Sequence, residues 1–355
     1  MPRWVTKFLD KLGSPELDWV QVEVTSRCNA ACIYCPQPLL YRKQHMPFSL
    51  FKQLLPYLGY TDLVYLQGWG EPLLNPDLFA MIRACKKKGK RVGFTTNGML
   101  LSEEVIHRLV DLETDIISVS LAGTSPATHN RIRKGTDLVI IIENLERLQR
   151  IKTEKGTEYP ALHFSYLMLA ANIHELKGVV EPAKRLGAGQ IVCSNLTLIT
   201  DETMWTEALF NREEEEERLA GVLEGIAEEV RRENLLFAYG RPILQKQPGH
   251  CSENIRSSCV VSVTGEVSPC VFASPTLSQP DRRNSSKPLL HIYQNSSVPC
   301  YPLTFGNIGK ESLTRIWNKK EYEQFRSFHD PDTPKTGINM LPVPQSCASC
   351  YKREA

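Results

Sequence analysis

The sequence has no long hydrophobic run. No stretch approaches the roughly 18 apolar residues that a membrane-spanning helix needs, so we expect no membrane span. No apolar segment follows Met1-Pro2-Arg3, so we also expect no secretory signal peptide. Both absences favour a cytoplasmic protein.

The sequence also has little net charge. It contains 42 Lys and Arg residues against 40 Asp and Glu residues, a formal net charge of +2. This balance gives no electrostatic reason to expect a nucleic acid or an anionic surface as a partner. The fractions of hydrophobic residues (42%) and charged residues (23%) are ordinary for a globular protein, and 355 residues are enough for about two domains.

Cysteine, in contrast, is abundant. The chain has 11 cysteines and no apparent signal peptide, which favours metal ligands in a reducing compartment over disulfides. Three of them, Cys28, Cys32 and Cys35, follow a strand-like run with the spacing C-x-x-x-C-x-x-C. A cubane 4Fe–4S cluster normally takes four thiolates, so three close thiolates predict a cluster with one open coordination site. An open iron is a site for chemistry rather than for electron storage.

A zinc site is the alternative for these cysteines. Zinc sites usually pair their cysteines as two C-x-x-C knuckles or combine them with histidines. The other C-x-x-C, Cys347 to Cys350, lies near the opposite end of the chain, and the nearest histidine is His45. The spacing therefore favours iron and sulfur over zinc.

Strand and helix patterns alternate six times along the first part of the chain. The strand-like runs, rich in Val, Ile, Leu and aromatic residues, are 19–25, 63–67, 91–95, 116–121, 162–169 and 190–195. This alternation predicts an α/β fold with a parallel sheet covered by helices. Six units are too few for a closed eight-stranded barrel, so we expect a partial (β/α)6 TIM-like barrel. In barrels the chemistry lies at the carboxyl ends of the strands, and the three cysteines follow the first strand.

Several residues predict where helices begin and end. Asn75 followed by Pro76 predicts an N-cap and a first helical residue, and Ser102 predicts the next N-cap. Asn172 is first an N-cap candidate for a helix over 173–186. Gly89 and Gly187 occupy positions where left-handed C-caps are expected.

The composition changes along the chain and predicts four parts. We expect a short N-terminal helix over 1–18, the barrel over 19–200 and a helical connector over 201–239. From residue 240 Pro, Ser, Asn and Cys become frequent, which predicts a small C-terminal domain over 240–355 held by metal rather than by a large core.

From about Trp19 to Thr200 the chain resembles the radical SAM superfamily. The resemblance rests on the three cysteines, on the aromatic Tyr34 before the last of them and on the 67–72 loop. It implies that the open iron binds the amino and carboxylate groups of S-adenosylmethionine. One electron then releases a 5'-deoxyadenosyl radical that abstracts hydrogen from an unactivated carbon, which side chains alone cannot do.

The loop Gln67-Gly68-Trp69-Gly70-Glu71-Pro72 resembles the glycine–glycine–glutamate motif of this family. Trp69 stands in place of the usual glycine. Glycine permits backbone to approach a ligand closely. The resemblance places Gly70 and Glu71 at the ammonium of the methionine part of the cofactor.

The resemblance implies further contacts to S-adenosylmethionine. Tyr34 would lie near the adenine, and Ser120 would contact the ribose or the carboxylate. Asn97 lies in a polar turn at the same end of the barrel, and Arg133 could clamp the carboxylate through two hydrogen bonds. A ribose contact is the second interpretation of Asn172.

The C-terminal part resembles the auxiliary-cluster extension called SPASM, or its shorter form Twitch. Cys251, Cys270, Cys347 and Cys350 match the spacing of the short form, with Cys259 as an alternative to Cys251. Cys85, Cys193 and Cys300 are most simply small buried hydrophobic residues.

The number of cysteines limits the number of auxiliary clusters. Two all-cysteine cubanes need eight thiolates, whereas the tail has six cysteines and ends five residues after the last one. We therefore expect one auxiliary cluster and two 4Fe–4S clusters in total. A zinc ribbon is the alternative for the tail cysteines.

Three functions compete at this point. Segments 120–136, 265–270 and 305–308 resemble a radical SAM subfamily that modifies the cofactor of tungsten-containing aldehyde oxidoreductases, which favours maturation of a peptide, protein or cofactor. A small-molecule dehydrogenase that oxidises an alcohol-bearing metabolite is the second function, and a non-enzymatic zinc-binding protein is the third. Either enzyme implies an external one-electron donor such as a flavodoxin or ferredoxin, because the chain has no flavin-binding signature. The residue that moves a proton cannot be named from sequence.

Overall fold

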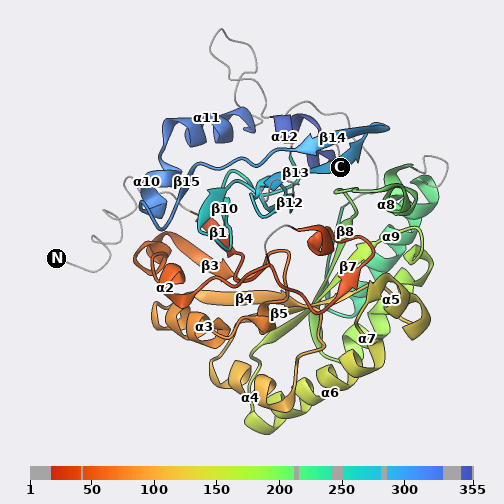
Figure 1. The fold of residues 1–355 in the computed structure, drawn as a ribbon. Coiled ribbons are helices and arrows are strands. Elements are labelled where there is room, and N and C mark those ends of the chain that lie inside the picture. Colours follow the sequence, from red (N-terminus) through yellow and green to blue (C-terminus); the bar gives the residue numbers. More distant parts are fainter. Residues whose placement is uncertain are drawn as a thin grey trace.

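A ten-stranded sheet forms the centre of the molecule (Figure 1). The computed structural model describes residues 17–40, 43–211, 216–240, 251–280, 286–330 and 345–353. The order of the strands is β15-β11-β10-β1-β3-β4-β5-β7-β8-β9. The helix predicted over 1–18 falls outside these residues, except for Leu17 and Asp18, which begin the first strand.

The six predicted strands form the middle of this sheet. They are β1 (Leu17–Val22), β3 (Thr61–Tyr65), β4 (Arg91–Thr96), β5 (Ile116–Leu121), β7 (Ala161–Met168) and β8 (Ala188–Asn195). Each pairs in parallel with its neighbour in this series. The predicted α/β fold with a mostly parallel sheet is confirmed.

The sheet extends beyond the six units at both ends. β9 (Leu236–Tyr239) pairs in parallel with β8, and β10 (Ser258–Val261) pairs in parallel with β1. β11 (Glu266–Ser268) and β15 (Gly306–Asn307) then continue the sheet antiparallel. The connector, predicted to be helical, therefore ends in a strand. These additions satisfy backbone groups on β1 and β8 that an edge strand would leave unpaired.

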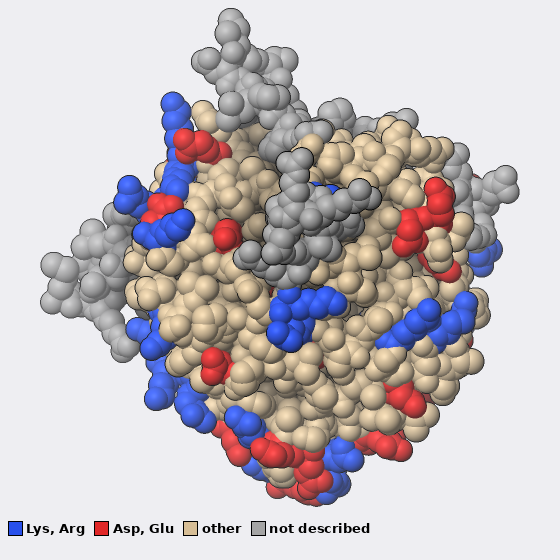
Figure 2. All heavy atoms as spheres, viewed as in Figure 1, with Lys and Arg blue, Asp and Glu red and all other residues tan. Residues whose placement is uncertain are grey.

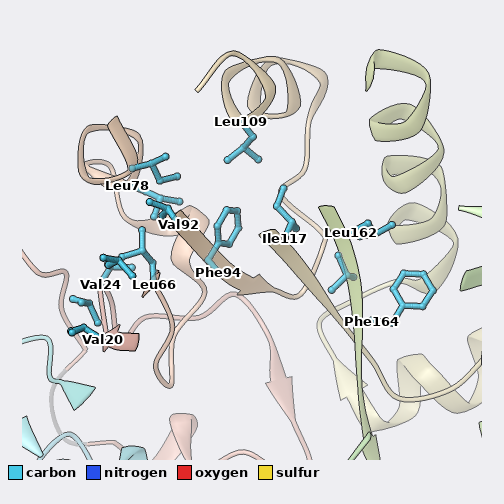
Figure 3. Packing of buried hydrophobic residues seen from close by; sticks show 14 of the residues in the cluster. Val20, Val24, Leu66, Leu78, Val92, Phe94, Leu109, Ile117, Leu162 and Phe164 are labelled. Carbon is cyan, nitrogen blue, oxygen red and sulfur yellow. The ribbon is translucent and has the colours of Figure 1, made fainter. Parts of the chain in front are cut away.

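Helices cover the outer face of the sheet (Figure 1). The helices of the barrel part are α2 (Phe48–Phe51), α3 (Leu78–Lys87), α4 (Glu103–Asp111), α5 (Pro126–Ile132), α6 (Leu138–Lys155), α7 (Val180–Arg185), α8 (Glu202–Glu207) and α9 (Glu216–Arg232). In Figure 3, Leu78 and Leu109 of α3 and α4 point toward Phe94 of β4, and all three side chains are fully buried. Burying such side chains contributes roughly 1.5–3 kcal/mol each, which fixes the helices on the sheet.

The C-terminal part adds a second, smaller sheet and short helices. β12 (Ser278–Pro280), β13 (Ser286–Tyr293) and β14 (Ser296–Cys300) are antiparallel, and α10 (Leu313–Trp317), α11 (Lys320–Phe328) and α12 (Gln345–Ala348) follow. β2 (Ala31–Cys32) and β6 (Arg133–Lys134) form a separate two-stranded ribbon. Among the described residues, no helix is long and apolar enough to cross a membrane.

Three of the predicted helix ends are confirmed. The Ser102 Oγ accepts a hydrogen bond from the Val105 N–H at 3.3 Å and caps α4. Gly89 and Gly187 have φ angles of +67° and +64°, the left-handed conformation expected after a helix.

The two predicted asparagine caps differ in outcome: the Asn75 cap is wrong, whereas Asn172 does precede a helical segment. Helix α3 begins at Leu78, after Asp77, and the buried Asn75 amide instead donates to the Val24 carbonyl at 2.6 Å. Asn172 occupies the N-cap position of the 3-10 helix η4 (Ile173–Val179), which α7 continues, as predicted. Its buried side chain makes no capping hydrogen bond, and instead accepts from the Leu169 N–H and donates to the Ala122 carbonyl. The Asn75 Oδ1 accepts the Asp77 N–H at 2.8 Å, so this amide serves a local turn as well as a tertiary contact. A buried amide must satisfy several donors and acceptors at once.

A buried carboxylate joins the barrel to the C-terminal part. Glu23 directly follows β1 and is 1% exposed. Its carboxylate accepts the N–H of Trp69 at 3.0 Å, the N–H of Val263 at 3.3 Å and the hydroxyl of Thr276. Burial raises the pKa of Glu23, and these hydrogen bonds lower it again in part. One side chain thus connects β1, the 67–72 loop and the segment that follows β10.

We expect Glu23→Ala to destabilise the protein by on the order of 2–3 kcal/mol, because it leaves buried donors without an acceptor. Urea unfolding measures this loss. Hydrogen exchange at Val263 should rise with it, because the amide loses its partner. Glu228→Ala, on the exposed surface of α9, is the matched control and should change stability by less than about 0.5 kcal/mol. An unchanged unfolding curve for Glu23→Ala would contradict this role.

Candidate functional site

The three N-terminal cysteines lie on one loop at the carboxyl end of β1. Cys32 belongs to β2 and pairs with Arg133 of β6. The Cys35 N–H donates to the Cys32 carbonyl at 3.1 Å, and the Cys28 sulfur accepts from the Ala30 N–H at 3.4 Å. These hydrogen bonds fold the loop back on itself, and the three sulfurs lie close enough to influence one another electrostatically.

The electrostatics of these thiols fit a metal cluster. Desolvation, with a smaller contribution from the Cys32 and Cys28 sulfurs, raises the pKa of Cys35 to about 12. Desolvation likewise raises the pKa of Cys28. Thiolates that lie close together in a partly buried site repel one another, so they need a nearby cation to stabilise them. Binding of a metal supplies this cation and releases the protons of the thiols.

The 67–72 loop packs directly on the cysteine loop. The Glu71 N–H donates to the Arg27 carbonyl at 2.8 Å. A Cβ added at Gly70 would lie 2.3 Å from the Thr25 carbonyl oxygen and 2.5 Å from that of Arg27. Glycine is thus needed at position 70 because a side chain would clash with the backbone of the cysteine loop. The sequence had instead suggested that a ligand approaches this glycine.

The Glu71 carboxylate is buried in a network of hydrogen bonds. It accepts from the Thr96 hydroxyl at 2.8 Å, from the Asn97 N–H at 2.7 Å and from the Leu73 N–H at 3.3 Å. Burial raises the pKa of Glu71 nonetheless. A carboxylate offers about four lone-pair sites, so one remains for a ligand. The Asn97 amide donates to Asn29 at 2.7 Å and holds the cysteine loop from its other side.

Arg133 is buried beside the thiols. It is 7% exposed, and its guanidinium donates to the Tyr34 hydroxyl. Its Nε has no partner among the described residues. Burial lowers the pKa of Arg133, but Tyr34 and the three cysteines raise it and the net shift is upward, so the side chain stays charged. A buried cation with a free donor needs an anionic partner.

A cavity of about 260 Å³ opens beside Arg133. This volume is near the lower end of ligand pockets, about 300–1,000 Å³. Of the predicted cofactor contacts, Tyr34, Ser120 and Arg133 line it, whereas Gly70, Glu71 and Asn97 are not among its lining residues. The other polar groups in the wall come from the ends of the strands: Gln67, Ser165, Ser194, Asn195 and Thr197.

The tail cysteines gather in a second group. Desolvation raises the pKa of Cys270 well above its usual value, and Cys350, Cys347 and Cys251 beside it raise it further. The Ser252 N–H donates to the Lys352 carbonyl at 2.9 Å, which joins the segments of Cys251 and Cys350. The four cysteines predicted from spacing are thus brought together from distant parts of the chain.

The other cysteines differ in their surroundings. Cys259 is fully buried on β10 in the hydrophobic core, near Arg326 and Tyr322, which favours Cys251 as the member of the tail group. Cys85 and Cys193 are also buried in the core, as predicted. Burial raises the pKa of Cys300 to about 12, and nearby Cys350 adds a smaller upward contribution, so Cys300 borders the tail group.

Among the described residues, no three His, Cys, Asp or Glu side chains converge tightly enough to hold a single metal ion. A cubane does not require such convergence, because it spreads its cysteine sulfurs around a cage of four irons. The donor set of each group, three or four thiols with few competing ligands, is therefore compatible with a cluster.

Sequence reasoning missed several residues of the site. Trp69 and Phe272 meet edge to face with ring centroids 6.0 Å apart and form one wall of the cavity. The Lys352 ammonium pairs with Glu253 at 2.8 Å beside the tail cysteines. Glu23 could have been predicted from the sequence, because an acidic residue directly after a buried strand is unusual. No local sequence pattern indicates that Phe272 or Lys352 belongs to the site.

Comparison with known proteins agrees with this geometry. The model of the radical SAM superfamily matches residues 22–183, and the model of the SPASM iron–sulfur cluster-binding domain matches residues 251–351. Together the two models match more than half of the chain.

Two relatives align along nearly the whole chain. A tungsten-containing aldehyde ferredoxin oxidoreductase cofactor-modifying protein of Pyrococcus furiosus is 26% identical over 96% of this chain and 88% of its own length. An AdoMet-dependent heme synthase of Methanosarcina barkeri is 24% identical over 93% of this chain and 90% of its own length.

Solved structures share the fold. Streptococcus suis SuiB bound to S-adenosylmethionine superposes with a TM-score of 0.63 at 13% identity, over 98% of this chain and 72% of SuiB. The enzyme anSMEcpe with bound AdoMet and a peptide gives 0.62 at 16% identity, over 96% of both chains. With its N-terminal cysteine loop, its sheet and its tail cysteines all in place, this chain belongs to the radical SAM superfamily and carries a SPASM domain.

Proposed function

We propose that this chain is a maturase that uses S-adenosylmethionine and two 4Fe–4S clusters to abstract hydrogen from a peptide, protein or cofactor. The observation that carries the proposal is that Cys28, Cys32 and Cys35 share one loop beside a cavity containing a buried, charged Arg133. When bound, the cluster supplies the electron that cleaves the sulfonium and yields the 5'-deoxyadenosyl radical.

The residues of the chain orient the cofactor in this proposal. Arg133 binds the carboxylate of S-adenosylmethionine, since it is a buried cation whose Nε lacks a partner among the described residues. Gly70 and the remaining lone pair of Glu71 receive the ammonium. Tyr34 and Ser120 line the part of the cavity that would hold the adenosine.

The tail cysteines hold the auxiliary cluster in this proposal. Cys251, Cys270, Cys347 and Cys350 provide four thiolates, so this cluster accepts or relays an electron rather than binding substrate. Phe272, two residues after Cys270, lines the cavity, which supports a role for the tail group close to the substrate.

The cofactor-modifying relative supports maturation as the reaction class, because the alignment covers both domains. A dehydrogenase acting on a small hydroxylated molecule is the second candidate. The observation that favours it is the hydroxyl-rich cavity wall, formed by Ser120, Ser165 and Ser194, which suits a compact polar substrate.

We expect protein reconstituted anaerobically with iron and sulfide to cleave S-adenosylmethionine to 5'-deoxyadenosine, measured by liquid chromatography. The Cys28→Ala/Cys32→Ala/Cys35→Ala variant should fall to the level of a protein-free blank, because it lacks the thiolates that hold the cluster. Cys85→Ala, in the core, is the control and should retain cleavage. Equal cleavage by the triple variant and the wild type would show that the assignment is wrong.

We expect Arg133→Met to weaken S-adenosylmethionine binding by about 10- to 150-fold, the equivalent of losing a charged hydrogen bond worth about 1.5–3 kcal/mol. Equilibrium dialysis measures the dissociation constant, and iron content should stay unchanged. Arg131→Met, two residues away and exposed, is the matched control. An unchanged dissociation constant in Arg133→Met would show that Arg133 does not bind the cofactor.

We expect roughly eight irons per chain after reconstitution, from two cubanes. Cys270→Ala/Cys350→Ala should lower this to about four, because it removes two of the four tail ligands. Elemental analysis of purified protein decides the point. About four irons with one zinc in the wild type would instead show a zinc ribbon in the tail.

A further inference from the structure

The backbone of Lys352 joins two segments that carry tail cysteines. Lys352 lies in the 3-10 helix η8 (Tyr351–Arg353), two residues after Cys350. Its carbonyl accepts the Ser252 N–H at 2.9 Å and the Ser252 hydroxyl at 3.2 Å. Its own N–H donates to the Cys350 sulfur. The position of Lys352 is therefore fixed relative to Cys350 and to the segment of Cys251.

The ammonium of Lys352 is held by two further groups. It pairs with the Glu253 carboxylate at 2.8 Å and lies 5.8 Å from the centre of the Phe272 ring. The Lys352 side chain is only 19% exposed. Phe272 also lines the cavity beside Arg133. The ammonium thus occupies a shielded position against a residue of the cavity wall.

Both charges of this ion pair act on a tail cysteine. Desolvation raises the pKa of Cys350 to about 12, and the Glu253 carboxylate adds a smaller upward contribution. The N–H and the ammonium of Lys352 lower the same pKa. The cation and the anion therefore lie within electrostatic reach of the Cys350 sulfur and have opposite effects on its negative charge.

Ion pairs on the outer surface have a different environment. Figure 2 shows acidic and basic atoms intermixed over α4 and α6, where Arg150 approaches Glu103. These two side chains are 54% and 57% exposed. Water and salt screen exposed pairs, so their charges have little effect on other groups. The Lys352 ammonium is less exposed, and its charge is screened less.

We propose that the Lys352 ammonium raises the reduction potential of the centre held by the four tail cysteines. The inference rests on the proposed function, in which this tail centre is a 4Fe–4S cluster. Reduction adds one negative charge to the centre, so a fixed cation stabilises the reduced state. Charge near a cluster and hydrogen bonds to its sulfurs are two determinants of its potential, and Lys352 contributes one of each. Glu253 opposes the cation and limits its effect.

A raised potential suits a centre that accepts an electron. In the proposed reaction the substrate radical left by hydrogen abstraction is oxidised by one electron, and the tail centre is reduced by one electron. Phe272 lines the cavity and lies next to the ammonium. The cation therefore acts where the cavity and the tail cysteines approach each other.

The test measures the potential of the tail centre by a redox titration followed by electron paramagnetic resonance. Full-length Cys28→Ala/Cys32→Ala/Cys35→Ala protein is reconstituted with iron and sulfide, so that the tail centre alone gives the signal. Lys352→Met in this background should lower the potential by the equivalent of a tenfold change in the one-electron equilibrium constant, about 59 mV. Glu253→Gln should raise it by a similar amount, because the opposing charge is lost.

A double variant and a matched control complete the test. Lys352→Met/Glu253→Gln removes both charges and should bring the potential back close to that of the background. Lys86→Met is the control, since the Lys86 ammonium pairs with Asp115 at 2.8 Å and lies 5.9 Å from the Tyr159 ring, at the amino end of β5. It should leave the potential unchanged. Iron content should be the same in all variants.

The outcomes separate this inference from the proposed function. Unchanged potentials in both single variants would overturn the inference. Shifts of both in the same direction would also overturn it, because they indicate entry of water rather than loss of a charge. If Lys352→Met loses its iron, the upward shift in Glu253→Gln still decides the point. A tail that binds zinc and no iron would instead overturn the auxiliary cluster of the proposed function, and this inference with it.

Discussion

The carboxyl end of β1 is the point on which the structure depends. Glu23 is buried there, and its carboxylate accepts hydrogen bonds from the 67–72 loop and from the C-terminal part. The parallel pairing of β1 with β3 on one side and β10 on the other holds this strand end in place. The cysteine loop begins a few residues after β1. The position of the three cysteines therefore depends on a strand whose two edges are both hydrogen-bonded to neighbouring strands.

This arrangement explains why the residues around the proposed site depend on one another. Glu71 holds the Thr96–Asn97 turn, Asn97 holds Asn29, and Gly70 packs on the backbone of the cysteine loop. These contacts join the loop that follows one strand of the sheet to the loop that follows the neighbouring strand. Arg133 then closes the site from β6, and the same two-residue strand turns Lys134 outward. The buried guanidinium on the inner face suits the carboxylate of the proposed cofactor.

The parts of this protein that sequence predicts best have a local signature. The six core strands are rich in Val, Ile, Leu and aromatic residues, and the cap at Ser102 and the glycines after α3 and α7 have the residue types that those backbone conformations favour. Asn75 and Asn172 have the same local signature as a cap, yet both amides are used for tertiary contacts. Local pattern cannot tell these two uses of a buried amide apart.

The sequence by itself determined the class of chemistry, because the spacing of Cys28, Cys32 and Cys35 limits which metal centre those thiols can share. It also determined the α/β fold, because apolar runs alternating with helices can be buried in few ways. Only the tertiary structure decided that β9 and β10 join the sheet, that Cys251 rather than Cys259 lies with the tail cysteines, and that Glu23 joins both parts. These facts depend on contacts between residues far apart in the chain, and no short segment encodes which distant partner will satisfy a strand edge, a thiol or a buried carboxylate.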